Sequence, residues 1–221
     1  LPSLVNAVSE IRQDFMIRIG MMNPMYMPRI KEELIKSFDS EKVYKFLHIP
    51  VQSGSNRVLH DMKRGHTVET FRDIVGKVKK RFLNFTISTD VIVGFPSETK
   101  EDFEKTVDLI SETHPDIVNL SKYSARPGTE AARWNQIEAV EVKRRSKIIF
   151  DLINKISLEN NQKWIGWKGK VLFDEETNEG IKGRNYAYKS VFVRENVKIG
   201  QTHIVEIVDA SIHSIIGKIA S

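Results

Sequence analysis

The chain has 221 residues, of which 40% are hydrophobic and 29% charged, a composition typical of folded globular proteins rather than of disordered or fibrous ones. No apolar run approaches the length of a membrane span and no secretory signal pattern opens the chain, so we expect a cytoplasmic protein. The net charge of +5 at pH 7 favours an anionic partner such as nucleic acid. Because the chain contains no cysteine, disulfides, zinc fingers and thiolate-bound clusters are excluded within it.

Residues 1–164 alternate between β-branched runs and amphipathic segments. The pattern predicts helices over residues 4–14, 30–38, 55–65, 67–82, 101–113 and 139–164, and strands over residues 15–21, 43–51, 85–93 and 116–123. Strands that alternate with helices form parallel βαβ units, so we expect an α/β fold. Four such units are too few to close an eight-stranded barrel, and the chain starts with Leu1 rather than Met. We therefore expect a piece of a longer protein whose barrel has further N-terminal strands.

The segment 85–99 is the centre of this pattern. A buried strand is predicted to end at Gly94, and Thr99 then offers a helix N-cap with Asp102 three residues on. Asp90 is a carboxylate within the otherwise apolar strand, and Gly94 would let a ligand approach the backbone. Asp90 and Gly94 could thus line a small-molecule pocket, or they could be a capping residue and a turn glycine.

Residues 162–221 have a different character. Short strand candidates at 168–173, 180–183, 187–193, 203–208 and 212–219 are separated by Gly, Asn and Asp turns. This spacing predicts a small antiparallel barrel of five strands, and the domain boundary falls near Gln162, between residues 1–161 and 162–221.

Polar residues follow each predicted parallel strand. Because the carboxyl ends of parallel strands lie at the same edge of the sheet, these residues should line one pocket there. They include Asn23, Gln52, Gly94 and Arg126. Neither a nucleophile–base pair nor a metal-ligand set stands out among them, so the catalytic residues are unknown and the pattern alone indicates a binding pocket. Arg64 could serve the pocket or could simply compensate a helix C-terminus.

Three longer stretches carry a family resemblance. LHIPVQSGSNRVLHDMKRGH (47–66), TDVIVGFPSET (89–99) and YSARPGTEAA (123–132), in this order, resemble the radical S-adenosylmethionine (SAM) methylthiotransferases, and RIGMMNP (18–24) fits the same family. The resemblance implies a partial radical SAM (β/α) barrel followed by a TRAM domain, a small RNA-binding β-barrel. The residues of these stretches are most similar to those of the archaeal and eukaryotic branch of the family. That branch acts on N6-threonylcarbamoyladenosine beside the tRNA anticodon.

The resemblance also implies roles for individual residues. Gln52 and Arg64 match positions that hold the SAM ribose and methionine carboxylate, Asp90 matches a ribose-hydroxyl acceptor, and Gly94 lies where backbone meets adenine. Arg126 would face the substrate. The family's CxxxCxxC loop, which binds a 4Fe-4S cluster, is absent from this chain and would precede Leu1, as would the domain of a second cluster. We therefore expect a C-terminal portion that is inactive without its missing N-terminal part.

Basic and aromatic residues of the TRAM-like part suit RNA phosphates and unstacked bases. The predicted RNA-binding residues are Lys168, Lys170, Lys182, Arg184, Tyr186, Lys189 and Arg194. The alternative is an ordinary solvated face, because nearby acidic residues nearly balance the charge.

Several functions stay open at this point. The chain could be part of a tRNA-modifying methylthiotransferase, or a non-catalytic module that binds tRNA. The parent enzyme could also act on a different adenosine or on a ribosomal protein. An unrelated α/β barrel enzyme with a β-barrel appendage is the remaining alternative.

Overall fold

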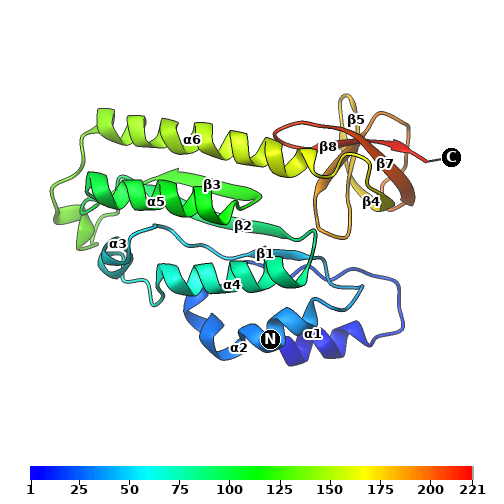
Figure 1. Ribbon diagram of the computed structural model, residues 1–221, viewed down its shortest axis with the longest axis horizontal. Coiled ribbons are helices and arrows are strands. Elements are labelled where there is room, and N and C mark those ends of the chain that lie inside the picture. Colours follow the sequence, from blue (N-terminus) through cyan, green and yellow to red (C-terminus); the bar gives the residue numbers. More distant parts are fainter. Residues whose placement is uncertain (221) are drawn as a thin grey trace.

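A computed structural model describes residues 1–220 and places three parallel strands at the centre of the first part of the chain (Figure 1). The strands β1 (Phe46–His48), β2 (Thr86–Val93) and β3 (Ile117–Lys122) form a sheet in the order β1-β2-β3. The helices of this part are α1 (Pro2–Ser9), α2 (Met27–Ser37), α3 (Asn56–Asp61), α4 (Val68–Arg81), α5 (Lys100–Thr113) and α6 (Ala139–Gln162), with short 3-10 turns η1 (Pro24–Tyr26) and η2 (Ala131–Arg133). None of the helices within residues 1–220 is long and apolar enough to cross a membrane.

The order of the strands follows the order of the chain, and successive helices pack on their neighbours. Apolar side chains of β2, including Ile87 and Val91, are buried against a helical layer that includes Phe71 and Ile149. This core holds the three strand ends in fixed positions. The predicted α/β architecture is therefore observed.

Local capping signals of the sequence are confirmed in the structure. Thr99 and Asp102 form a reciprocal capping box at the start of α5, in which each side chain accepts a hydrogen bond from the other residue's backbone N–H. The Ser55 side chain accepts from the N–H of Val58 at the start of α3, and Thr67 caps α4. These caps fix where the helices after β1 and β2 begin.

The N-terminal predictions are partly wrong. The first helix ends at Ser9 rather than residue 14, and the strand predicted over residues 15–21 is absent except for one isolated bridge between Ile17 and Val43. A strand needs a continuous row of backbone hydrogen-bonding partners, and the backbone of this run forms a strand-like bridge only at Ile17. The strand predicted over residues 43–51 is continuous only over the three residues of β1, and Val43 adds an isolated bridge.

The C-terminal part is a closed barrel of five strands in the order β4-β5-β6-β8-β7. The strands are β4 (Lys168–Thr177), β5 (Gly180–Arg184), β6 (Ser190–Val193), β7 (Thr202–Ala210) and β8 (Ile215–Ile219). The barrel encloses its own hydrophobic core, which includes Trp164 and Phe173. It is not fully antiparallel as predicted, because β8 lies between β7 and β6 and closes the barrel by pairing in parallel with β6.

The barrel packs against the amino-terminal end of the sheet, where α6 leads into it (Figure 1). The N–H of Lys45, just before β1, donates to the carbonyl of Tyr186 at 2.8 Å. Lys189 Nζ lies 2.7 Å from Asp116 Oδ1, just before β3. The barrel therefore lies at the opposite end of the sheet from the carboxyl ends of the strands.

Candidate ligand-binding site

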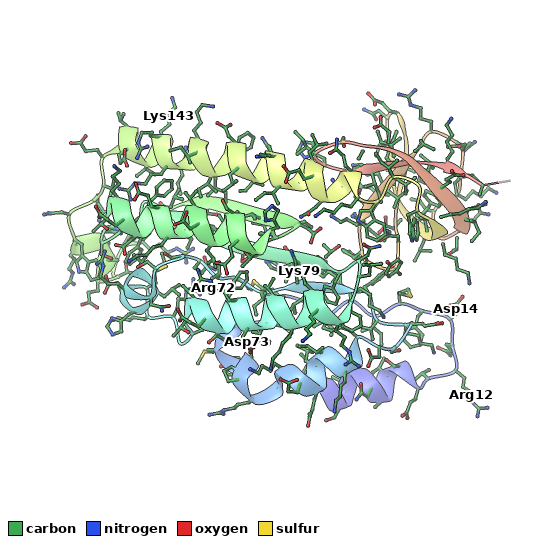
Figure 2. All side chains as sticks on the ribbon, in the orientation of Figure 1. Arg12, Asp14, Arg72, Asp73, Lys79 and Lys143 are labelled. Carbon is green, nitrogen blue, oxygen red and sulfur yellow. The ribbon has the colours of Figure 1, made fainter. Side chains whose placement is uncertain are left out.

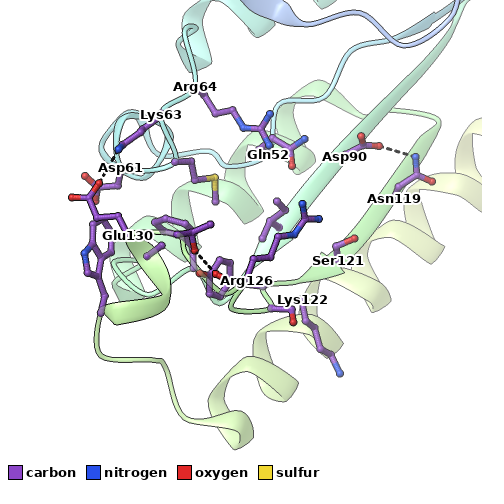
Figure 3. Close-up of a pocket in the computed structure, with 18 of the residues that line it drawn as sticks. Gln52, Asp61, Lys63, Arg64, Asp90, Asn119, Ser121, Lys122, Arg126 and Glu130 are labelled. Atoms are coloured by element: carbon purple, nitrogen blue, oxygen red, sulfur yellow. Dashed lines mark hydrogen bonds and ion pairs between the residues drawn. The ribbon is translucent and has the colours of Figure 1, made fainter.

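A pocket of about 1020 Å³ opens at the carboxyl ends of β1, β2 and β3 (Figure 3). Its walls are strand residues that alternate toward one face, the turn after α3 and the loop after β3. The lining residues are His48, Gln52, Asp61, Met62, Lys63, Arg64, Asp90, Ile92, Phe95, Asn119, Ser121, Lys122, Tyr123, Ser124, Arg126, Gly128, Thr129, Glu130, Ala131 and Trp134.

Asp90 is the centre of a polar group that spans all three strands. Its Oδ1 lies 2.8 Å from His48 Nε2 and accepts a 2.8 Å hydrogen bond from Asn119 Nδ2. Asp90 and Asn119 are register partners in the parallel sheet. Within residues 1–220, these side-chain hydrogen bonds use only Oδ1, so Oδ2 is available to a hydroxyl of a ligand.

Gln52 has a strained backbone at the edge of this pocket. Its φ of 71° lies in the left-handed region, which costs a non-glycine residue about 1–2 kcal/mol. Two hydrogen bonds to β2 impose this conformation: the N–H of Gln52 donates to the Asp90 carbonyl at 2.8 Å, and its own carbonyl accepts from the N–H of Ile92 at 2.9 Å. Strain of this kind is concentrated at functional sites, which supports the pocket as a binding site.

Arg64 is directed into the pocket by a Schellman motif at the end of α3. The N–H of Lys63 donates to the carbonyl of His60 at 2.8 Å, and the N–H of Arg64 donates to the carbonyl of Leu59 at 2.9 Å. The left-handed residue of this motif is therefore Lys63, with φ of 57°. This turn projects the exposed Arg64 side chain into the pocket (Figure 3).

Arg126 enters the pocket from the side opposite Arg64 (Figure 3). Its loop is tightened by two hydrogen bonds from Thr129 to the Arg126 carbonyl, at 3.2 Å from the N–H and 2.8 Å from Oγ1. Among the lining residues, the rings of Phe95 and Trp134 meet edge to face with centroids 5.8 Å apart. The pocket thus combines two guanidinium groups with an aromatic wall.

Gly94 lies beside the pocket and is not among its lining residues. Its N–H donates to Glu98 Oε2 at 2.9 Å, and a Cβ at this position would meet Val142 of α6. Glu98 is buried and accepts a 2.7 Å bond from Arg145 of α6. Burial raises the pKa of Glu98, against the hydrogen bonds from Gly94 and Arg145 that lower it. The loop after β2 is therefore fastened to α6; Phe95 of this loop lines the cavity, whereas Gly94, which we expected there, is not among the lining residues.

The loop that carries Gln52 rests on α5. A Cβ on Gly54 would lie 2.5 Å from the Cα of Thr106, so only glycine allows this approach, and the Gly54 N–H donates to Thr106 Oγ1 at 2.9 Å. Asp102 accepts a 2.6 Å bond from Ser55 Oγ and pairs with Arg57. Burial alone would raise the pKa of Asp102, but its bonds from Ser55, Arg57 and the adjacent cap lower that pKa well below its ordinary value.

The charged and polar groups of the pocket can hold a polar ligand by direct hydrogen bonds and ion pairs. Guanidinium groups suit a carboxylate or phosphate, while Asp90 and Gln52 suit hydroxyls. No group of three or more His, Cys, Asp or Glu side chains that could hold a metal ion occurs within residues 1–220.

The profile of the radical SAM superfamily matches residues 1–110, which include β1, β2 and the turn that presents Arg64. The chain belongs to the radical SAM superfamily. A solved radical SAM enzyme, coproporphyrinogen III oxidase from Escherichia coli, shares the fold with a TM-score of 0.56 at 14% identity, over 93% of this radical SAM chain and 50% of the other.

Relatives of this radical SAM chain have specific names. It is 49% identical to a probable threonylcarbamoyladenosine tRNA methylthiotransferase from Archaeoglobus fulgidus, over 100% of this chain and 52% of that protein. The protein of the same name from Pyrococcus abyssi is 41% identical with the same coverage. A threonylcarbamoyladenosine tRNA methylthiotransferase from Xenopus laevis is 37% identical over 99% of this chain and 40% of that protein. The chain spans about half the length of the archaeal relatives it matches.

The structure places the barrel residues of this radical SAM chain in different environments. Lys189 is only 6% exposed and binds Asp116 and Asn161, so it lies inside the contact between barrel and sheet and not on the surface where we expected it. Lys182 and Arg184 already face carboxylates on β4. Of the predicted RNA-binding residues, the exposed basic ones are Lys168, Lys170 and Arg194.

Several pocket residues of this radical SAM chain were not found from the sequence. Asn119 could have been found, because it lies next to Asp90 once the register of β3 is known. Lys122 and Trp134 carry no sequence signal, because they reach the pocket through the end of β3 and a returning loop. Conversely, Asn23 caps a 3-10 turn and is not among the lining residues.

Proposed function

We propose that this chain is the C-terminal portion of a radical SAM enzyme that adds a methylthio group to N6-threonylcarbamoyladenosine in tRNA. In this proposal residues 1–161 belong to a partial (β/α) barrel, and residues 162–221 are a TRAM-like RNA-binding barrel. The observation that carries it is the convergence of Gln52, Arg64 and Asp90, from separate family-like segments, on one pocket at the carboxyl ends of the strands.

The pocket residues fit SAM. Arg64 would form a forked pair with the methionine carboxylate, and Asp90 Oδ2, together with the Gln52 amide, would hold the ribose hydroxyls. The aromatic wall at Phe95 offers a surface for a planar ring. When bound, SAM supplies the radical chemistry of the family, and the side chains named here orient it.

The chain does not fit an iron–sulfur cluster, because it contains no cysteine. Cluster ligands would have to come from another part of a longer protein. We therefore derive no reaction step through a cluster from these residues, and we expect this chain alone to be inactive.

A second candidate is a tRNA-binding module without catalysis. The absence of cysteine favours it for this chain taken alone. The two candidates differ in what a longer protein does: the first requires a CxxxCxxC segment upstream of Leu1 and methylthio-modified nucleosides in tRNA, and the second requires neither.

The decisive experiment compares tRNA nucleosides by mass spectrometry in cells with and without the gene that encodes the longer protein, called here the longer gene. Loss of the methylthio form of threonylcarbamoyladenosine in the deletion strain is expected. Restoration by the longer gene but not by residues 1–221 supports the first candidate. An unchanged nucleoside profile contradicts it.

A binding measurement tests the pocket itself. In the longer protein, Arg64→Ala should weaken SAM binding by about 1.5–3 kcal/mol, the range for a hydrogen bond to a charged group. Arg133→Ala is a matched control, because Arg133 is exposed and is not among the pocket residues. Calorimetry that gives equal affinities for the two variants removes Arg64 from the site.

A further inference from the structure

A second cavity, of about 170 Å³, lies where the barrel meets the sheet and helices. We call it the seam pocket. It is bounded by the end of α4, the loop before β2, the end of α6 and the barrel residue Lys189. Figure 2 shows Lys79 on α4, at the part of the helix toward the barrel. Neither the superfamily match nor the pocket described above accounts for this cavity.

Three ammonium groups and one carboxylate line the seam pocket: Lys79, Lys163, Lys189 and Asp116. Lys189 Nζ pairs with Asp116 Oδ1 at 2.7 Å. The other two lysines have only neutral acceptors within residues 1–220: Lys79 donates to backbone carbonyls at 2.7 and 2.9 Å, and Lys163 donates to an asparagine side chain at 2.8 Å. The cavity therefore carries an excess of positive charge.

The lowered pKa of Lys79 agrees with this excess of positive charge. Burial lowers its pKa, and the neighbouring Lys163 and Lys189 lower it further, against the opposing effect of Asp116. An anion placed among these ammonium groups would relieve their mutual repulsion. A phosphate group has the charge and the acceptor oxygens for this position.

The rim of the seam pocket is apolar and aromatic. Leu83 is 96% exposed, the largest exposed fraction among the large hydrophobic side chains of residues 1–220. Near this rim, the Tyr186 ring of the barrel packs on Trp164, which lines the pocket, with centroids 5.7 Å apart. An apolar side chain and a half-exposed ring beside a phosphate site suit a nucleotide base.

We propose that the seam pocket binds a backbone phosphate of RNA, with the adjoining nucleotide on the Leu83 rim. This inference rests on the proposed RNA function and names where the RNA is held. Seven residues separate Phe85, at the seam pocket, from Ile92, at the ligand pocket. That is about 23 Å along a strand, a separation that one tRNA molecule is long enough to span.

The test measures binding of labelled, unmodified tRNA to the 221-residue chain by fluorescence anisotropy, between 50 and 300 mM salt. Lys163→Gln should weaken binding by about 5- to 10-fold at 0.1 M salt and reduce the log–log salt slope by about 0.7–0.9, the loss of one phosphate contact. Lys163→Arg should bind like the parent chain. Lys36→Gln, an exposed lysine near the end of α2, is the charge-matched control and should change neither quantity. Melting temperatures must agree among all variants.

A parallel measurement follows the thermal stabilisation of each variant by inorganic phosphate. If Lys163→Gln abolishes that stabilisation but leaves tRNA affinity and slope unchanged, the pocket takes a free anion and the RNA proposal is overturned. If the parent chain binds tRNA and Lys163→Gln binds equally well, the seam pocket is not an RNA contact although the proposed function survives. If the parent chain fails to bind tRNA at 50 mM salt, RNA binding by this chain fails, and this inference fails with it.

Discussion

Replacing Lys189 by alanine should destabilise the chain far more than replacing Lys182, although both are barrel lysines that face a carboxylate. The Lys189 and Asp116 side chains are only 7% and 10% exposed, and their atoms lie 2.7 Å apart. Lys189→Ala would remove the ammonium group that pairs directly with the buried Asp116 carboxylate, leaving only the more distant Lys79 and Lys163 of the seam pocket. The pair also joins the barrel to the sheet, because the two residues belong to different parts of the chain.

The magnitude follows from this geometry. Removing one partner of a buried ion pair costs about 3–5 kcal/mol. Asp116 keeps a 2.9 Å hydrogen bond from the N–H of Ile87 and borders the open seam pocket, so we expect the lower end, about 3 kcal/mol. The Lys182–Glu175 pair is 3.2 Å long with side chains 32% and 48% exposed, and its loss should cost at most about 1 kcal/mol.

Urea denaturation followed by tryptophan fluorescence measures both variants. Trp134 reports on the pocket loop, and Trp164 reports on the barrel core. Comparable losses for Lys189→Ala and Lys182→Ala would refute the argument that the seam ion pair is a structural contact. Asp116→Asn combined with Lys189→Ala should be less destabilising than the sum of the single variants, because both lose the same direct ion pair.

Two further substitutions test the support of the ligand pocket. Gly54→Ala should destabilise the chain by about 1–3 kcal/mol, because the added methyl meets the α5 backbone; a midpoint in urea equal to that of the parent chain would contradict this. Asp102→Asn should cost about 2 kcal/mol near neutral pH, because charge-assisted bonds are lost. The pKa of Asp102 is lowered by folding from its ordinary value of 3.8, so its stabilisation is fully present above that value and is lost as the pH falls through the folded pKa. The difference in stability between the parent chain and the Asp102→Asn variant, measured by urea unfolding at pH 7 and pH 3, should therefore shrink in acid, and a constant difference would show that the carboxylate charge is unimportant.

The sequence by itself determined the features that depend on neighbours along the chain. The capping box of Thr99 and Asp102 needs only a spacing of three residues, and the buried strand before Gly94 is specified by its β-branched run. The five barrel strands follow from short apolar runs between turns. The family motifs likewise indicated Gln52, Arg64 and Asp90, which the fold brings to one pocket.

Only the tertiary structure decided what distant segments do to one another. The run at residues 15–21 alternates like a strand but has a single bridging partner, and no local pattern could reveal that. The N–H of Gly94 donates to Glu98, and Glu98 in turn is held by Arg145 of α6, which lies far along the chain. Lys189 looked like its surface neighbours in the sequence, yet it is buried against Asp116. Local propensity specifies where elements begin and end, whereas burial and charge pairing depend on which elements meet, and that is a property of the whole fold.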